Sequence, residues 1–239
     1  MLKTVSYFSA GVSSAVATKL AINQIDIVMY THIDDHHPDT KRFVANVENW
    51  IGKGILVEQS PLESVDNACR MARFIKNRNG GAACTRRLKR DVNKKFECDH
   101  IGMLRIVWGF DCTEKTRMQR VQQSMPNHEH IFPLAENNMT KQDAHQALAA
   151  AGIKRPAMYD LGYHNNNCIG CIKGGMGYWN KIRIDFPDVF SARSRLERDI
   201  GFAILGRNIW LDELDPHRGR HAGPICGDCG LLCETLQIN

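Results

Sequence analysis

The chain has 239 residues, of which 43% are hydrophobic and 24% are charged, as in an ordinary soluble globular protein. No apolar run approaches the ~18–20 residues that span a bilayer, so we expect no membrane association. The formal net charge of +5 suits an anionic ligand but does not by itself demonstrate nucleic-acid binding. The first residues do not have the pattern of a signal peptide, and we expect a cytoplasmic protein.

The first half of the chain alternates between strand-like and helix-like segments. Periodicity and β-branched content predict strands at residues 4–9, 25–33, 55–60 and 104–110, with helical spacing at residues 13–22 and 41–54. This alternation predicts βαβ units and therefore an α/β fold with a doubly wound, mostly parallel sheet. Residues 1–165 would form this domain, and the Cys-rich residues 166–239 would form a C-terminal region packed on it.

Polar clusters follow three of the predicted strands. They occupy residues 9–14, 34–40 and 111–117. Ligands of doubly wound sheets bind at the carboxyl ends of the strands, so this coincidence predicts a binding site there.

The segment "SAGVSS", Ser9 to Ser14, joins the first predicted strand to a helix. Free amides and the helix dipole make such a turn an anion site, unless it is an ordinary turn that binds nothing. Gly11 would allow close approach and a positive φ, and Ser13 or Ser14 would cap the helix. The segment matches neither the Walker P-loop nor the G-x-G-x-x-G fingerprint.

Other segments contain basic residues or cysteines that could bind a ligand or react. "TRRLKRDVNKK", residues 85–95, is either a solvated helix face or a surface for phosphate or nucleic acid. Nine cysteines include a C-x-x-C pair and the cluster "CGDCGLLC" at residues 226–233. In a cytosolic chain such groups indicate metal or sulfur chemistry more than structural disulfides. "GGMGYWNKIR", residues 174–183, either lines the substrate entry or forms a structural turn in which Trp179 packs. "AHQALAAAGI" is predicted to be a core-facing helix.

"SAGVSS" resembles the PP-loop, S-G-G-x-D-S, of the adenine-nucleotide α-hydrolase superfamily, also called PP-loop ATP pyrophosphatases. That superfamily includes phosphoadenosine phosphosulfate (PAPS) reductases, ATP sulfurylase small subunits, tRNA-thiolating enzymes and DNA-phosphorothioation enzymes. Ala10 stands at the first glycine of the motif. Ser13 stands at the aspartate, which in ATP-cleaving members is thought to help organise Mg²⁺ and pyrophosphate.

Further segments resemble the PAPS reductase branch, in the same order along the chain. The resemblance covers roughly residues 4–175 and includes "CTRRLKR" before the fourth strand. Asp111 stands where an arginine is common. The remaining motif matches are Asp34, Pro38, Asp39 and Thr40; Gly109, Glu114 and Arg117; Pro133, Leu134, Thr140, Asp143 and Gly152; and Pro156, Tyr159, Gly162 and Cys168 or Cys171.

The resemblance implies an adenine nucleotide, ATP or PAPS, with Mg²⁺. The adenosine would lie across the ends of the first two strands. Asp34 and Asp39 would hold ribose or Mg²⁺, or Asp39 would simply begin the next helix. The residues implied to bind the nucleotide are Ser9, Ala10, Gly11, Ser13, Ser14, Asp34, Asp39 and Gly109; the available cations are Arg86, Arg87, Lys89 and Arg117; and the residues expected to act in catalysis are Ser13, Arg117 and Cys229.

Two enzyme classes share such a site. Reductases end in an E-C-G-L-H motif whose cysteine attacks the sulfonate sulfur, and thioredoxin restores it; "DCGLL" resembles this motif at Cys229. The other class cleaves ATP to AMP and pyrophosphate, adenylates a nucleic-acid acceptor and lets a persulfide displace AMP, with a cysteine desulfurase as donor. The basic segment and extra cysteines favour sulfur transfer, whereas Ser13 and the "DCGL" motif favour the reductase. The third hypothesis is a nucleotide-binding subunit without catalytic activity.

The cysteines also predict a metal site. Cys168 and Cys171, with two of Cys226, Cys229 and Cys233, would supply four thiolates for zinc or for an iron–sulfur cluster. Cys84 is a further candidate ligand, because cluster-bearing reductases use a cysteine in that segment. The alternative is reduced thiols that pack or form a redox pair. Four histidines could be metal ligands, but we expect them to be solvated or to cap helices: His36, His37, His217 and His221.

Overall fold

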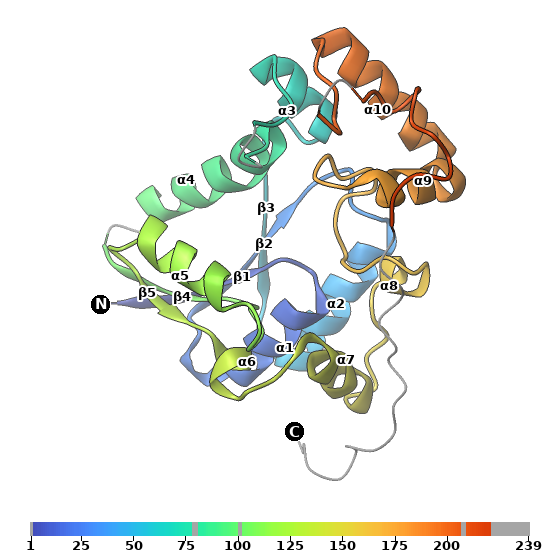
Figure 1. The fold of residues 1–239 in the computed structure, drawn as a ribbon. Helices are drawn as coiled ribbons and strands as arrows, with labels where there is room; N and C mark the ends of the chain where they lie inside the picture. Colours follow the sequence, from blue (N-terminus) through green and yellow to red (C-terminus); the bar gives the residue numbers. More distant parts are fainter. Residues whose placement is uncertain (1, 78–80, 100–101, 207–208, 221–239) are drawn as a thin grey trace.

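The computed structural model describes residues 2–77, 81–99, 102–206 and 209–220 (Figure 1). Its centre is a five-stranded, all-parallel sheet with the strand order β3-β2-β1-β4-β5. The predicted α/β, doubly wound fold is confirmed. The strands are β1 (Lys3–Phe8), β2 (Ile27–His32), β3 (Ile55–Gln59), β4 (Leu104–Val107) and β5 (Glu129–Ile131).

Helices connect the strands and continue beyond the sheet. Ten α-helices lie in the described residues, together with a 3₁₀ turn, η1 (Ile22–Gln24), and a π-helical segment, η2 (Thr85–Arg90). The α-helices are α1 (Val12–Leu20), α2 (Asp39–Ile51), α3 (Val65–Ala72), α4 (Asp91–Asp99), α5 (Lys115–Ser124), α6 (Pro133–Glu136), α7 (Lys141–Ala150), α8 (Ala157–Asp160), α9 (Met176–Asp185) and α10 (Pro187–Ile200).

Successive side chains of the strands pack into two hydrophobic clusters, one on each face of the sheet. Phe8 and Val28 point to one face of the sheet, where they pack with α1, α2, α6 and α7. Val5, three residues before Phe8, and Met29, next to Val28, point to the opposite face. The two-residue period of a strand explains this division. "AHQALAAAGI" lies largely within α7, whose buried residues include Leu148, so its predicted place against the core is confirmed.

A third hydrophobic cluster joins segments from both ends of the chain. Ala68 of α3 and Leu88 of η2 pack with Trp179 of α9 and Leu196 of α10. Residues 174–183 therefore belong mostly to a helix whose tryptophan is fully buried, and are not a turn. This cluster attaches the segment after residue 165 to the end of the sheet.

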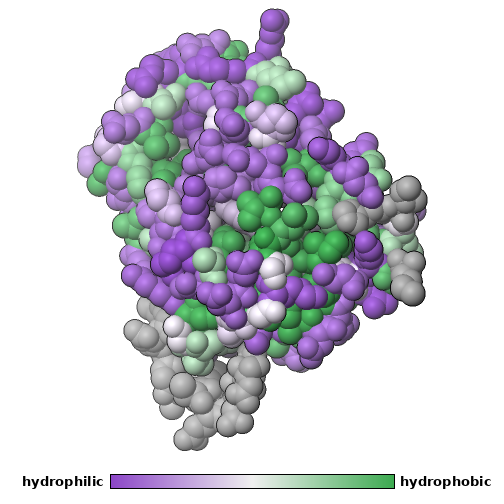
Figure 2. Space-filling view, turned by 180° about the vertical axis from the view of Figure 1, so that it is seen from behind, coloured by the Kyte–Doolittle hydropathy of each residue, from purple (hydrophilic) through white to green (hydrophobic). Residues whose placement is uncertain are grey.

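The surface combines hydrophilic and hydrophobic areas. Seen from behind, hydrophobic residues gather near the centre of the face, with mainly hydrophilic residues around them (Figure 2). Leu56 and Val57, on the edge strand β3, are among the exposed large hydrophobic residues. Among the described residues, no helix has the length and apolarity required to cross a membrane.

Candidate functional site

The loop from Ser9 to Ser14 connects β1 to α1 at the carboxyl edge of the sheet. Ala10 has a left-handed backbone, with φ of 55°, which costs a non-glycine residue about 1–2 kcal/mol. The buried side chain of Asn166 holds this conformation, because its Nδ2 donates to the Ala10 carbonyl at 2.7 Å. Ala10 thus adopts, at the position where the PP-loop carries glycine, the conformation that glycine adopts most readily.

Gly11 plays a different part from the one predicted. Its φ is −98°, so the predicted positive φ at Gly11 is wrong. Helix α1 begins at Val12 with Gly11 as its N-cap and without a side-chain cap, so the predicted capping by Ser13 or Ser14 is also wrong. Ser14 instead lies inside the first turn, where its hydroxyl donates to the Gly11 carbonyl at 2.9 Å.

Hydroxyl groups connect the two ends of this loop. Ser14 Oγ accepts from the Ser9 amide at 3.2 Å and lies 3.0 Å from Ser9 Oγ. The Ser13 side chain has no hydrogen-bond partner within the described part of the chain, so its hydroxyl is available to a ligand. The first amides of a helix have no acceptor within the helix. Tyr159 takes one of them, because its buried hydroxyl accepts from the Val12 amide at 3.4 Å.

Gly109 brings the end of β4 against the same loop. A Cβ atom at this position would lie 2.6 Å from Ser14 Cα and 2.7 Å from Ser14 N. Both neighbours are backbone atoms at the start of α1, which do not move without shifting the helix. The absence of a side chain at Gly109 therefore sets the distance between β4 and the loop.

The two predicted aspartates after β2 have different surroundings. Asp34 is exposed, and its Oδ1 accepts from Gln59 Nε2 at 2.7 Å. Asp39 accepts two hydrogen bonds from Arg42, at 2.6 and 2.8 Å, and one from the Ala157 amide at 2.8 Å. The Arg42 hydrogen bonds lower the pKa of Asp39 to about 2. Asp39 therefore links α2 to α8, while Asp34 is the carboxylate more open to a ligand.

The motif after β4 forms a compact turn. The buried carboxylate of Asp111 accepts from the Thr113 amide at 2.8 Å. Arg117 pairs with Glu114, and its guanidinium lies 4.4 Å from the centre of the Phe110 ring. The Arg117 side chain is 61% exposed, so it is available to an anion from solvent.

Cys84, Cys168 and Cys171 come from two distant segments and interact electrostatically. Burial raises the pKa of Cys84, and the neighbouring Cys171 raises it further. Burial also raises the pKa of the Cys168 thiol to about 12, although the charge of Lys89 opposes this rise. Cys171 is less buried than Cys168 and is therefore the more accessible thiol of the C-x-x-C pair.

Arg193 fixes the cysteine loop to the segment that follows β2. Its guanidinium is 4% exposed and pairs with Asp35 and Asp66. Its Nε donates to the carbonyl of Gly170, between the two cysteines, at 3.4 Å. The Ile169 amide donates to the Asp35 carbonyl at 2.8 Å. The sequence does not single out Arg193, because nothing in the spacing of α10 distinguishes this arginine from exposed ones.

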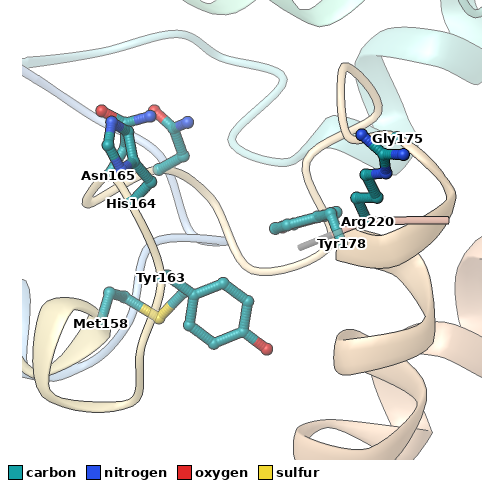
Figure 3. A pocket seen from close by; sticks show the side chains of 8 residues that line it. Met158, Tyr163, His164, Asn165, Gly175, Tyr178 and Arg220 are labelled. Atoms are coloured by element: carbon teal, nitrogen blue, oxygen red, sulfur yellow. The ribbon is translucent and has the colours of Figure 1, made fainter. Parts of the chain in front are cut away.

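A cavity of about 180 Å³ opens beside the cysteine loop (Figure 3). Tyr178 connects the cavity to the C-x-x-C pair, because its hydroxyl accepts from the Cys171 amide at 2.8 Å and donates to the Cys168 carbonyl at 3.3 Å. The lining is partly aromatic and partly polar. It consists of Met158, Tyr163, His164, Asn165, Asn167, Gly175, Tyr178 and Arg220.

The histidines differ from expectation at one position. His36 is buried, and its Nδ1 lies 2.8 Å from the Tyr30 hydroxyl, so the prediction of a solvated or capping residue is wrong there. Burial lowers the pKa of His36 to about 3, and Lys89 contributes to this shift. His37 Nδ1 accepts from the Asp39 amide at 3.2 Å, although Pro38 is the N-cap residue of α2. His217 is exposed, and His221 lies outside the described residues.

The predicted metal site depends on residues outside the described part. Cys226, Cys229 and Cys233 fall there, and so does the motif "DCGLL". Within the described ranges, no group of three or more His, Cys, Asp or Glu side chains would hold a metal ion. Cys84, Cys168 and Cys171 therefore do not fit zinc or an iron–sulfur cluster by themselves. The four-thiolate site stays a prediction.

The family is shown by comparison with known proteins. A family model described as "Phosphoadenosine phosphosulfate reductase domain" matches residues 3–174. These residues include the whole sheet, the loop from Ser9 to Ser14 and the C-x-x-C pair. A search of curated proteins gave no match. The chain belongs to the phosphoadenosine phosphosulfate reductase domain family, whose members bind adenine nucleotides.

Proposed function

We propose that this protein is a PP-loop enzyme that cleaves ATP to AMP and pyrophosphate and activates a nucleic-acid acceptor for sulfur transfer. The observation that carries the proposal is the contact between the PP-loop and the segment that carries the C-x-x-C pair. Asn166, which holds Ala10 in its left-handed conformation, lies two residues before Cys168. The same short segment thus contacts the PP-loop and carries the two thiols of the C-x-x-C pair.

The loop would hold the phosphates of ATP. The free amides at the start of α1 and the positive end of its dipole favour an anion there. Ser9, Ser13 and Ser14 supply hydroxyl groups, and Arg117 supplies an exposed positive charge near the end of β4. A nucleotide-bound Mg²⁺ needs only one or two protein carboxylates, and Asp34 is the carboxylate we assign to it. The ion would neutralise phosphate charge.

Cys171 is the thiol we assign to carry sulfur. Its higher exposure makes it accessible to a donor protein such as a cysteine desulfurase, whereas burial holds Cys168 in the protonated form. The terminal sulfur of a Cys171 persulfide would displace AMP from the adenylated acceptor. A second thiolate, such as Cys84 or Cys229, would then attack the Cys171 sulfur, form a disulfide and leave the sulfur on the acceptor. A thiol reductant would restore both cysteines.

Reduction of PAPS or of adenosine phosphosulfate is the second candidate. Two observations favour it: the description of the matched family, and Ser13, which replaces a carboxylate used in ATP-cleaving members. In that reaction Cys229 would attack the sulfonate sulfur, and a thioredoxin would release sulfite. A nucleotide-binding subunit without turnover is the least favoured hypothesis.

Zinc or an iron–sulfur cluster stays a separate proposal for Cys168, Cys171, Cys226, Cys229 and Cys233. Metal and sulfide analysis of the anaerobically purified protein tests it, with Cys168→Ser analysed in parallel. We expect metal in the wild type and less in the variant. Zero metal in both would refute it.

Pyrophosphate release from ATP and Mg²⁺, in the presence of single-stranded nucleic acid as the acceptor, tests the proposed activity. Asn166→Ala should lower the rate at least about tenfold, because the left-handed Ala10 loses its hydrogen bond and the loop is misplaced. Asn49→Ala, which alters an exposed asparagine of α2, is the matched control and should change the rate less than about twofold. Equal rates in the two variants would contradict the role of the Asn166 contact, and no release by the wild type would refute the activity.

A further inference from the structure

The positive charge of this protein is concentrated in one stretch of the chain. Residues 85–125 contain ten lysines and arginines against five aspartates and glutamates. Their excess of five positive charges equals the formal net charge of the whole chain, so the other residues are neutral in sum. Such segregation produces a directional field that attracts a polyanion.

Helices α4 and α5 of this stretch pack on one face of the sheet, to which the stretch also contributes strand β4. Phe96 of α4 and Met125, at the end of α5, pack against the same hydrophobic cluster, which contains Val5 and Ile106. Helices α4 and α5 therefore lie on the same side of the sheet (Figure 1). Their outer surfaces turn to solvent, and α5 has no buried residue at all.

The cations on this face are mostly free to bind. Helix α5 carries Lys115, Arg117 and Arg120 and no acidic residue. Among the described residues, Arg117 and Arg87 form ion pairs, but the other exposed cations of η2, α4 and α5 do not. Those unpaired, exposed cations are Arg86, Arg90, Lys94, Lys95, Lys115 and Arg120.

A column of aromatic rings lies between these cations and the PP-loop. Trp108 stacks on Phe110 with a centroid distance of 5.6 Å and an interplanar angle of 18°, and Phe110 stacks on Phe132 at 6.0 Å and 15°. Trp108 and Phe110 are half-buried and flank Gly109, which touches Ser14 of the loop. Aromatic rings beside a basic track are the features by which proteins bind single-stranded nucleic acid.

We infer that the exposed face of η2, α4 and α5 is a docking surface for a single-stranded segment of nucleic acid. The phosphodiester backbone follows the cations of α4 and α5, and a base reaches the aromatic column beside the PP-loop. This inference rests on the proposed function, because it names the surface that presents the acceptor to the activated nucleotide.

Fluorescence anisotropy with a labelled 20-nucleotide single-stranded DNA tests the surface, in the full chain and without ATP. Binding should weaken as salt rises, with a slope of about −0.7 per phosphate contact. Lys115→Glu combined with Arg120→Glu should weaken binding at least about tenfold and reduce the slope by about 1.4, since two contacts are lost. Lys94→Glu combined with Lys95→Glu should act in the same direction.

Arg195→Glu is the matched control, because Arg195 is an exposed arginine of α10 without an ion pair among the described residues. It should change affinity less than about twofold. Circular dichroism of each variant establishes that it is folded. Equal losses in the control and the α5 variant would overturn the inference, and so would tighter binding of a duplex of the same sequence. Because no ATP is present, this result is independent of pyrophosphate release, which tests the proposed function.

Discussion

Replacement of Gly109 by alanine is the sharpest structural test of the loop. The new methyl group would lie 2.6–2.7 Å from two backbone atoms of Ser14, whereas carbon atoms in contact normally stay about 3.5–4.0 Å apart. The start of α1 must therefore move by about 1 Å. Overpacking of this kind costs about 1–3 kcal/mol, which corresponds to a fall of roughly 2–12 °C in Tm for a chain of this size. A displacement of about 1 Å also lowers rates by about 100-fold.

Thermal unfolding and pyrophosphate release measure these two effects. Gly54→Ala is the matched control, because its Cβ atom would meet only the end of the flexible Glu48 side chain, at 3.8 Å. The control should retain the Tm and the rate of the wild type to within about 1 °C and twofold. A Gly109→Ala protein as stable and as active as this control would refute the argument that close packing at Gly109 positions the loop.

Three further substitutions or reactions test other contacts. His145 is buried with neither ring nitrogen hydrogen-bonded, and burial lowers its pKa to about 4, below the ordinary 6.5. The folded protein therefore loses stability as pH falls from about 6.5 towards 4, because the unfolded chain protonates His145 more readily. His145→Phe should raise the Tm, by more at pH 5 than at pH 7. An equal or lower Tm at both pH values would contradict this. Arg193→Met removes the buried partner of the half-buried carboxylates of Asp35 and Asp66 and should lower the free energy of unfolding, measured in urea, by about 3 kcal/mol. Arg195→Met should lower it by less than about 0.5 kcal/mol, and similar losses in the two variants would refute the role of the Arg193 ion pairs. Iodoacetamide at pH 8, followed by mass spectrometry, should label Cys171 faster than Cys168, and equal rates would contradict the assignment of Cys171 as the accessible thiol.

The architecture was largely predictable because it depends on local patterns. Four strands lie in segments rich in apolar and β-branched residues, and the sequence predicts each of them to within a few residues. The fifth strand, Glu129–Ile131, was missed because three residues, one of them charged, carry no readable period. Residues 174–183 were also ambiguous, since glycines at their start hide a helix that tertiary packing of Trp179 stabilises.

The site was predictable only in part, because its contacts join distant residues. The position of the loop from Ser9 to Ser14 follows from the strand before it, but the left-handed Ala10 depends on Asn166, 156 residues away. Asp39 was a candidate ligand by its motif, yet Arg42 and the Ala157 amide engage its carboxylate. Hydrogen bonds between such distant residues cannot be predicted from local sequence patterns, because they form only when the chain folds.

One product analysis tests the central claim most directly. The protein is incubated anaerobically with equal amounts of ATP and PAPS, Mg²⁺, single-stranded nucleic acid, a thiol reductant, and a cysteine desulfurase with cysteine as the sulfur donor. The nucleotides and sulfur anions are then separated. The account predicts AMP and pyrophosphate in equal amounts, with PAPS unchanged. Sulfite and adenosine 3′,5′-bisphosphate, formed while ATP stays intact, would contradict it and would identify the protein as a reductase.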